Sequence, residues 1–169
     1  TFGGKLRQAI GGGAKMDPDM IDRMLDAGFP IFGGYGRTET SPITHANRPG
    51  RGNRIGTVGP PLPGVEARLE PVPGGAPGEG EVWIKGPNVM QGYFHNPALT
   101  AEVLVDGWFR TGDIGRADGE GYLTICGRVK NVIVLESGKN VYPEEVEEEL
   151  AKSPLFKEVC VIGRKAGRA

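Results

Sequence analysis

The hydrophobic positions at the start of the chain switch between strand-like and helical spacing. Residues 6–10 and 29–32 form short apolar runs, whereas the apolar residues between Asp17 and Gly28 recur at the spacing of a helix face. Asp17 and Pro18 are typical of a helix start, and Gly28 is typical of its end. A strand, a helix and a second strand in about 30 residues predict a βαβ unit of a parallel sheet.

The period changes to two in the middle of the chain. A polar, loop-like stretch covers residues 41–54, and apolar and polar residues then alternate in short runs between residues 57 and 105. Asn96 and Pro97 interrupt the alternation and predict a short helix. A hairpin is expected over residues 114–126. Together these patterns predict an antiparallel, barrel-like sheet.

The end of the chain predicts a smaller unit. Short β-runs at residues 132–135 and 141–142 precede a helix that starts at Pro143 with acidic residues in its first turn. An apolar run at residues 159–162 predicts a last strand. The expected fold class is therefore α/β and α+β, with one βαβ piece of a parallel sheet, an antiparallel β-barrel-like subdomain and the start of a small α+β C-terminal domain.

Composition and charge narrow the range of partners. The 169 residues carry a formal net charge of −1, which argues against a nucleic-acid-binding or anionic-membrane-binding surface. No apolar run approaches the roughly 18–20 residues that cross a bilayer. Cys126 and Cys160 lie in apolar, strand-like runs, so we expect reduced core thiols in a cytoplasmic protein, with peripheral attachment to a membrane as an alternative.

Two polar groups in the second half of the chain suggest a binding site. Asp113 follows Arg-Thr-Gly, and Arg128 with Lys130 follows the next hairpin. A carboxylate and a guanidinium joined by a hairpin can return to one place and hold a polyhydroxylated ligand such as a ribose. The alternatives are a turn-capping aspartate and solvated charges at the hairpin end.

A glycine-rich segment follows the second predicted strand, at the end where open α/β sheets bind ligands. It offers the flat face of Tyr35, the hydroxyl of Thr38 and the carboxylate of Glu39. The alternative is a glycine-rich turn with a capping Thr38, a solvated Glu39 and Tyr35 in the core. His45 and His95 have no second ligand at metal spacing and are interpreted as surface or structural residues.

Five motifs resemble, in order and spacing, those of the adenylate-forming superfamily, which comprises acyl-CoA synthetases, luciferases and the adenylation domains of peptide synthetases. They are YGRTE at 35–39, GEVWIKG leading to MQGY at 80–93, WFRTGD at 108–113, GRVK at 127–130 and GKNVYPEEVE at 138–147. The last motif is most similar to bacterial fatty acyl-CoA ligases. The resemblance implies an enzyme that activates a fatty acid with ATP and Mg²⁺ to acyl-AMP and transfers the acyl group to coenzyme A.

The resemblance also implies how the first half of the chain would hold the nucleotide. The backbone of Gly12, Gly13 and Ala14 would flank the adenine, and the ring of Tyr35 would stack on it. Thr38 would donate a hydrogen bond to the α-phosphate.

The remaining roles implied by the resemblance concern the metal, the sugar and the domain movement. Glu39 would hold Mg²⁺, a hard cation that prefers oxygen ligands. Asp113 would accept hydrogen bonds from both ribose hydroxyls, and Arg128 would donate to the same sugar. Lys130 would be the hinge between two domains, and Gly138 would let the arm of coenzyme A approach the backbone.

The domain organisation follows from the same resemblance. Residues 1–127 would be the end of a large adenylating domain, with the βαβ piece at 1–45 and the β subdomain at 46–127, and residues 128–169 would be a truncated small domain. The phosphate loop and the late catalytic lysine of the superfamily do not occur in the sequence, which implies an inactive fragment of a longer enzyme. The alternatives are a nucleotide-binding module without catalysis and a peptide-synthetase adenylation domain.

The partners implied are the small molecules ATP, fatty acid and coenzyme A. A single βαβ unit cannot bury both faces of its sheet, so we also expect exposed apolar surface around residues 6–10 and 31–32. Exposed strand edges there predict self-association.

Overall fold

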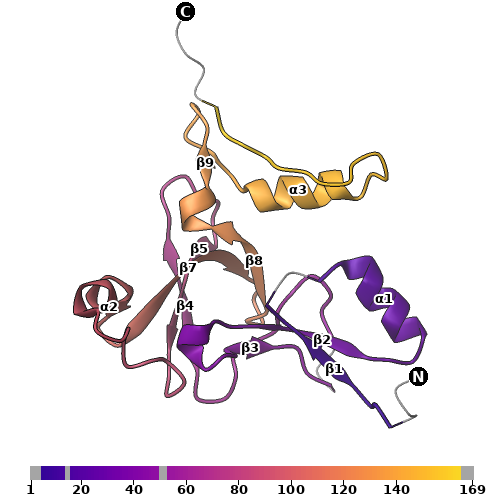
Figure 1. Ribbon diagram of the computed structural model, residues 1–169, viewed down its shortest axis with the longest axis horizontal. Coiled ribbons are helices and arrows are strands. Elements are labelled where there is room, and N and C mark those ends of the chain that lie inside the picture. The colour runs from indigo at the N-terminus through magenta and orange to yellow at the C-terminus, as the bar shows by residue number, and fades with distance from the viewer. Residues whose placement is uncertain (1–4, 14–15, 50–52, 165–169) are drawn as a thin grey trace, which may run out of the picture.

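The structure of the protein is a computed structural model that describes residues 5–13, 16–49 and 53–164. Figure 1 shows a small sheet with one helix at the start of the chain, a strongly curved antiparallel sheet in the middle, and a C-terminal segment of short strands and one helix. The predicted mixture of a βαβ piece, an antiparallel sheet and a small α+β segment is confirmed.

The first part of the chain forms a three-stranded sheet. Strands β1 (Ala9–Gly11) and β2 (Ile31–Tyr35) pair in parallel and are joined by helix α1 (Pro18–Asp26). Strand β3 (His45–Ala46) pairs antiparallel with β2, which gives the order β1-β2-β3. The carboxyl end of β2 therefore lies between two neighbouring strands.

The ends of α1 are the ones that the sequence predicts. Asp17 caps the helix by accepting a hydrogen bond from the N–H of Asp19 at 2.9 Å, and Gly28 takes a φ of 78°, which favours glycine. The first strand begins three residues later than predicted. Its register explains the shift, because Ala9 pairs with Ile31, the first residue of β2.

The middle of the chain forms a five-stranded antiparallel sheet. Its strands are β4 (Glu66–Pro71), β5 (Glu79–Lys85), β6 (Leu104–Val105), β7 (Trp108–Ala117) and β8 (Leu123–Arg128). β7 is central, with β5 on one edge and both β6 and β8 on the other. Helix α2 (Pro97–Val103) precedes β6 and is capped by Asn96, as predicted.

Two apolar clusters connect these parts. Val82, Ile84 and Leu123 are buried in the first cluster, where Tyr35 of the small sheet packs against the antiparallel sheet. The second cluster, of Ile114, Cys126 and Tyr142, joins the antiparallel sheet to the C-terminal segment. Burial of apolar surface therefore holds the small sheet against β5 and β8, and the C-terminal segment against β7 and β8.

The C-terminal segment follows β8 without a long linker. A 3₁₀ turn, η2 (Val129–Asn131), leads into the antiparallel pair β9 (Ile133–Val134) and β10 (Asn140–Val141), and α3 (Pro143–Ala151) follows. Tyr142 donates a hydrogen bond to Glu79 Oε2 at 2.9 Å. The segment is thus attached to the sheet by a polar contact as well as by its apolar cluster.

Part of the predicted polar loop at residues 41–54 is buried structure. His45 is only 2% exposed and belongs to β3, which supports its structural interpretation. Asn47 is also buried, and its side chain donates to the carbonyl of Thr57 at 2.8 Å. Polar side chains here satisfy backbone groups of neighbouring loops, so they are inside without being hydrophobic.

Two expectations about the end of the chain are wrong. Residues 159–162 form no strand, because the structure assigns them no pairing partner in the part of the chain that it describes. The N–H of Val161 donates instead to Glu147 Oε1 at 2.8 Å. Cys160 is exposed, whereas Cys126 is buried as expected.

The expected exposed apolar surface is present only on β1 and before it. Leu6 and Ile10 are 41% and 59% exposed, but Phe32 on the neighbouring strand is buried. Self-association through this edge stays a prediction. In the described ranges, no helix combines the length and the apolar character needed to span a bilayer.

Candidate functional site

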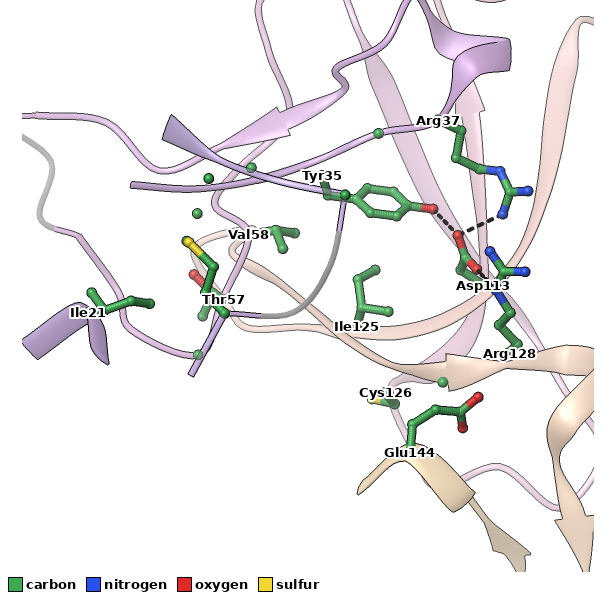
Figure 2. A pocket seen from close by; sticks show the side chains of 18 of the residues that line it. Ile21, Tyr35, Arg37, Thr57, Val58, Asp113, Ile125, Cys126, Arg128 and Glu144 are labelled. Atoms are coloured by element: carbon green, nitrogen blue, oxygen red, sulfur yellow. Dashed lines mark hydrogen bonds and ion pairs between the residues drawn. The ribbon is translucent and has the colours of Figure 1, made fainter. Parts of the chain in front are cut away.

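A cavity of about 510 Å³ lies between the small sheet, β8 and the start of α3 (Figure 2). One side of its wall is backbone from Gly11, Gly13 and residues 33–36. The opposite side includes Ile125 and Asp113. A volume of this size is typical of small-molecule sites, and a glycine backbone lets a flat ligand approach the main chain closely.

Asp113 is the polar centre of the cavity wall. Its Oδ1 lies 3.2 Å from Arg128 Nε, and its Oδ2 accepts hydrogen bonds from Tyr35 Oη at 2.7 Å and from Arg37 Nη1 at 3.1 Å (Figure 2). Asp113 is 5% exposed, while the side chain of Arg128 is 59% exposed. Two cations and one phenol therefore surround a buried carboxylate, which compensates the cost of burying its charge.

The local sequence explains why Asp113 faces the cavity. Gly112 takes a φ of 71°, and the N–H of Asp113 donates to the hydroxyl of Thr111 at 3.0 Å. Thr111 in turn donates to the carbonyl of Val82 on β5 at 2.7 Å. Asp113 pairs directly with Arg128 across β7 and β8, so the hairpin places both side chains on the same face.

Tyr35 ends β2 and extends its ring along the cavity toward Asp113 (Figure 2). Burial and the charge of Asp113 raise the pKa of Tyr35 well above its usual range, so the phenol stays protonated and donates its hydrogen bond. The ring also packs against the buried cluster of Val82, Ile84 and Leu123. Tyr35 is both a core residue and part of the cavity wall.

Arg37 is a site residue that the sequence interpretation missed. Its Nη1 donates to Asp113 and, at 2.9 Å, to the carbonyl of Thr111, while its Nε lies 3.6 Å from Glu39 Oε2. The neighbouring carboxylates raise the pKa of Arg37 although burial opposes this. The available signal was its place two positions after Tyr35, because alternate residues of an extended segment face the same side.

Thr38 and Glu39 lie on a 3₁₀ turn, η1 (Thr38–Thr40), just beyond the residues that line the cavity. Tyr93 donates a hydrogen bond to Glu39 Oε1 at 2.9 Å. Burial opposes ionisation of Glu39, but hydrogen bonds from its own N–H and from Tyr93, together with the charge of Arg37, lower its pKa. Glu39 is therefore a carboxylate with a negative charge at the edge of the cavity.

Comparison with protein families accounts for this arrangement. A family model described as "AMP-binding enzyme" matches residues 1–94, which is more than half of the chain. This chain belongs to the AMP-binding enzyme family. The similar proteins described below are named CoA synthases, synthetases or ligases. The family is also the one that the five sequence motifs resemble.

The relatives of this chain are named for different acids. Feruloyl-CoA synthase of Amycolatopsis sp is 43% identical over 165 residues, covering 94% of this chain and 33% of the relative. A long-chain-fatty-acid–CoA ligase of Bacillus subtilis is 44% identical over 163 residues, covering 94% and 29%. The chain thus spans about a third of the length of the curated relatives that it matches.

A solved structure agrees with the fold. The o-succinylbenzoate CoA synthetase of Bacillus subtilis, in complex with its acyl-adenylate intermediate, superposes with a TM-score of 0.86 at 32% identity. The match covers 95% of this chain and 34% of that protein. The two chains therefore share a fold over the matched part.

The predicted adenine-flanking residues of this AMP-binding enzyme follow β1. Gly13 lines the cavity, and a Cβ on Gly12 would lie 3.2 Å from the carbonyl oxygen of Gly34, so two backbones approach closely there. Ala14 lies outside the described residues. Gly12 therefore lies against the backbone of β2, and Gly13 lines the same cavity as Tyr35; their role beside adenine stays a prediction.

The proposed hinge and coenzyme A residues lie away from the cavity. Lys130 is exposed on η2, and Gly138 lines a second cavity of about 550 Å³ near residues 74–79. Asn131 and Glu144, which the sequence interpretation also missed, line the first cavity and join through a 2.6 Å hydrogen bond. The C-terminal segment thus contributes to both cavities.

Residues that could hold a divalent cation are few. In the described part of the chain, no group of three or more His, Cys, Asp and Glu side chains gathers as a metal site. Glu39 is a single ionised carboxylate at the cavity edge. This fits Mg²⁺, which proteins commonly bind through one or two carboxylates together with substrate phosphates.

Proposed function

We propose that this chain is the C-terminal part of an acid–CoA ligase that activates a fatty acid with ATP to acyl-AMP and then transfers it to coenzyme A. The observation that carries the proposal is the convergence of Tyr35, Asp113 and Arg128 on one nucleoside-sized cavity. The family match and the CoA-ligase relatives support the reaction class.

In this proposal Asp113 binds the hydroxyl groups of the sugar. A carboxylate offers about four acceptor positions, and three protein groups occupy Asp113 in the structure: Tyr35 and Arg37 through hydrogen bonds, and Arg128 through an ion pair. One sugar hydroxyl can therefore bind directly, and the second can replace one of the donors. Arg128 is the donor best suited to exchange, since its side chain is the most exposed of the three and can turn toward the same sugar.

The base and the phosphates occupy the two ends of the cavity. Adenine would lie on the ring of Tyr35, against the backbone of Gly12, Gly13 and Ala14. Thr38 would donate to the α-phosphate, and Glu39 would hold Mg²⁺. The cation, when bound, neutralises charge on the phosphates, while Tyr93 and Arg37 keep the carboxylate of Glu39 ionised and in place.

The domain boundary is part of the same proposal. Residues 1–127 would belong to the large adenylating domain and residues 128–169 to the small domain, with Lys130 at the hinge. Support comes from η2, which turns the chain out of the antiparallel sheet directly after Arg128. Rotation there would carry Gly138 from the second cavity toward the nucleotide, where its backbone could approach coenzyme A.

The test is pyrophosphate release by the complete protein that contains this chain, with ATP, Mg²⁺ and a panel of acids. Fatty acids of several lengths should release pyrophosphate and, with coenzyme A, form acyl-CoA detectable by mass spectrometry. Residues 1–169 alone should be inactive. Nucleotide binding without pyrophosphate release from any acid would favour a binding module instead, and turnover of ferulate alone would replace the fatty acid by an aromatic one.

A further inference from the structure

Arg37 stands between two carboxylates that come from distant parts of the chain. Asp113 belongs to β7 and Glu39 to η1, and the guanidinium of Arg37 lies 3.1 Å from the first and 3.6 Å from the second. In the proposed function, one of these carboxylates holds the sugar and the other holds the cation. A single side chain therefore touches both ends of the nucleotide site.

The guanidinium is held in a fixed orientation. Its Nη1 donates to the backbone carbonyl of Thr111 as well as to Asp113, so two acceptors on β7 hold it. The Nε atom is buried and has no hydrogen-bond partner, so its contact with Glu39 is an ion pair without a hydrogen bond. Arg37 is thus anchored at Asp113 and acts on Glu39 mainly through its charge.

We propose that Arg37 is a positioning residue that orients Asp113 for the sugar and, through the same guanidinium, weakens the attraction of Glu39 for a divalent cation. The inference rests on the proposed function. It predicts opposite effects of removing the guanidinium, because Asp113 loses an orienting partner while Glu39 loses a competing positive charge. A residue that only pinned η1 to β7 would impair both ends of the site together.

The first variant for the test is Arg37→Gln in the complete protein, without acid substrate. Adenosine and AMP binding, measured by calorimetry without Mg²⁺, should each weaken roughly tenfold, because Asp113 loses the charge-assisted hydrogen bond that orients it before the sugar binds. Mg²⁺ should raise the affinity for ATP, and the free Mg²⁺ concentration that gives half of this increase should be about two- to five-fold lower in the variant. A change of this size corresponds to the loss of a partly exposed ion pair.

The second variant, Arg37→Lys, separates charge from geometry. An ammonium keeps the positive charge but cannot form the planar fork that reaches Thr111, Asp113 and Glu39 together. We expect weaker adenosine binding with an unchanged Mg²⁺ dependence. Arg110→Gln is the matched control, since Arg110 is on the same strand as Asp113 but pairs with Glu81 and does not line the cavity; it should behave as wild type in both assays.

The outcomes separate this inference from the proposed function. Failure of the wild-type protein to bind adenosine, AMP or ATP would overturn the proposed function itself. Wild-type binding with an unaltered Arg37→Gln variant would overturn only the positioning role. Loss of AMP binding with unchanged adenosine binding would make Arg37 a phosphate ligand and would also overturn it. If Arg37→Gln lowers the melting temperature too far to measure binding, the Arg37→Lys result decides alone.

Discussion

Replacing Asp113 by Asn tests the sugar-binding role most directly. In the structure, the carboxylate accepts from one phenol and pairs with two guanidinium groups. Asn keeps the shape and one acceptor oxygen but removes the charge and the second acceptor. The variant therefore changes what Asp113 can accept with little change in volume.

The magnitude follows from the bonds that would be lost. Hydrogen bonds to a charged acceptor contribute about 1.5–3 kcal/mol each, and a neutral one about 1 kcal/mol. Two ribose hydroxyls on a carboxylate, reduced to one on a neutral amide, should weaken AMP binding by about 3 kcal/mol. This corresponds to a rise of roughly 100- to 200-fold in Kd.

The assay compares two ligands by calorimetry on the complete protein. Against 2′,3′-dideoxy-AMP, which lacks both hydroxyls, Asp113→Asn should change Kd less than about threefold. Asp118→Asn is the control, because Asp118 also pairs with an arginine, Arg54, but at an exposed hairpin tip. An equal loss of affinity for AMP and for the dideoxy ligand would refute the reasoning, since the carboxylate would then act on something other than the sugar.

Three further predictions concern stability. Burial lowers the pKa of His45 to about 4, so protonation of its ring opposes folding as the pH falls from 6.5 to 4. In denaturant titrations over this range, the free energy of unfolding of the wild type should fall by up to about 3 kcal/mol more than that of a His45→Gln variant. A Cβ on Gly36 would lie 1.8 Å from a backbone oxygen, so Gly36→Ala should prevent stable folding, whereas Gly119→Ala, with nothing within 4 Å, should leave the melting temperature unchanged. Tyr142→Phe should remove the bond to the Glu79 carboxylate and cost about 1.5–3 kcal/mol. Hydrogen exchange should accelerate selectively in residues 137–147, and uniform acceleration along the chain would contradict the attachment that we describe.

The parts of the fold that the sequence predicted are those with local signals. The start of α1 depends on Asp17 and Pro18, and the start of α2 depends on Asn96, all within a few residues of the helix that they begin. The hairpin of β7 and β8 depends on the turn at residues 118–121 between alternating strands. Backbone propensity and capping act over such short distances, so a pattern along the chain is sufficient.

The parts that the sequence missed depend on distant partners. His45 and Asn47 look like loop residues, yet they are buried because Asn47 binds the carbonyl of Thr57 and the backbone of Gly33. The apolar run at residues 159–162 looks like a strand but has no pairing partner among the described residues. Burial of a polar group is favourable only where another segment supplies its hydrogen-bond partners. The local sequence does not show which distant segment supplies them.

The candidate site divides in the same way. The motifs around Tyr35, Glu39, Asp113 and Arg128 already show the ring, the carboxylates and the guanidinium that a nucleotide needs. That Arg37 joins two of these groups, and that the C-terminal segment lines part of the cavity, follows from the three-dimensional arrangement alone. Residue type is a local property, whereas the distance between charges depends on how β2, β7 and β8 pack against one another.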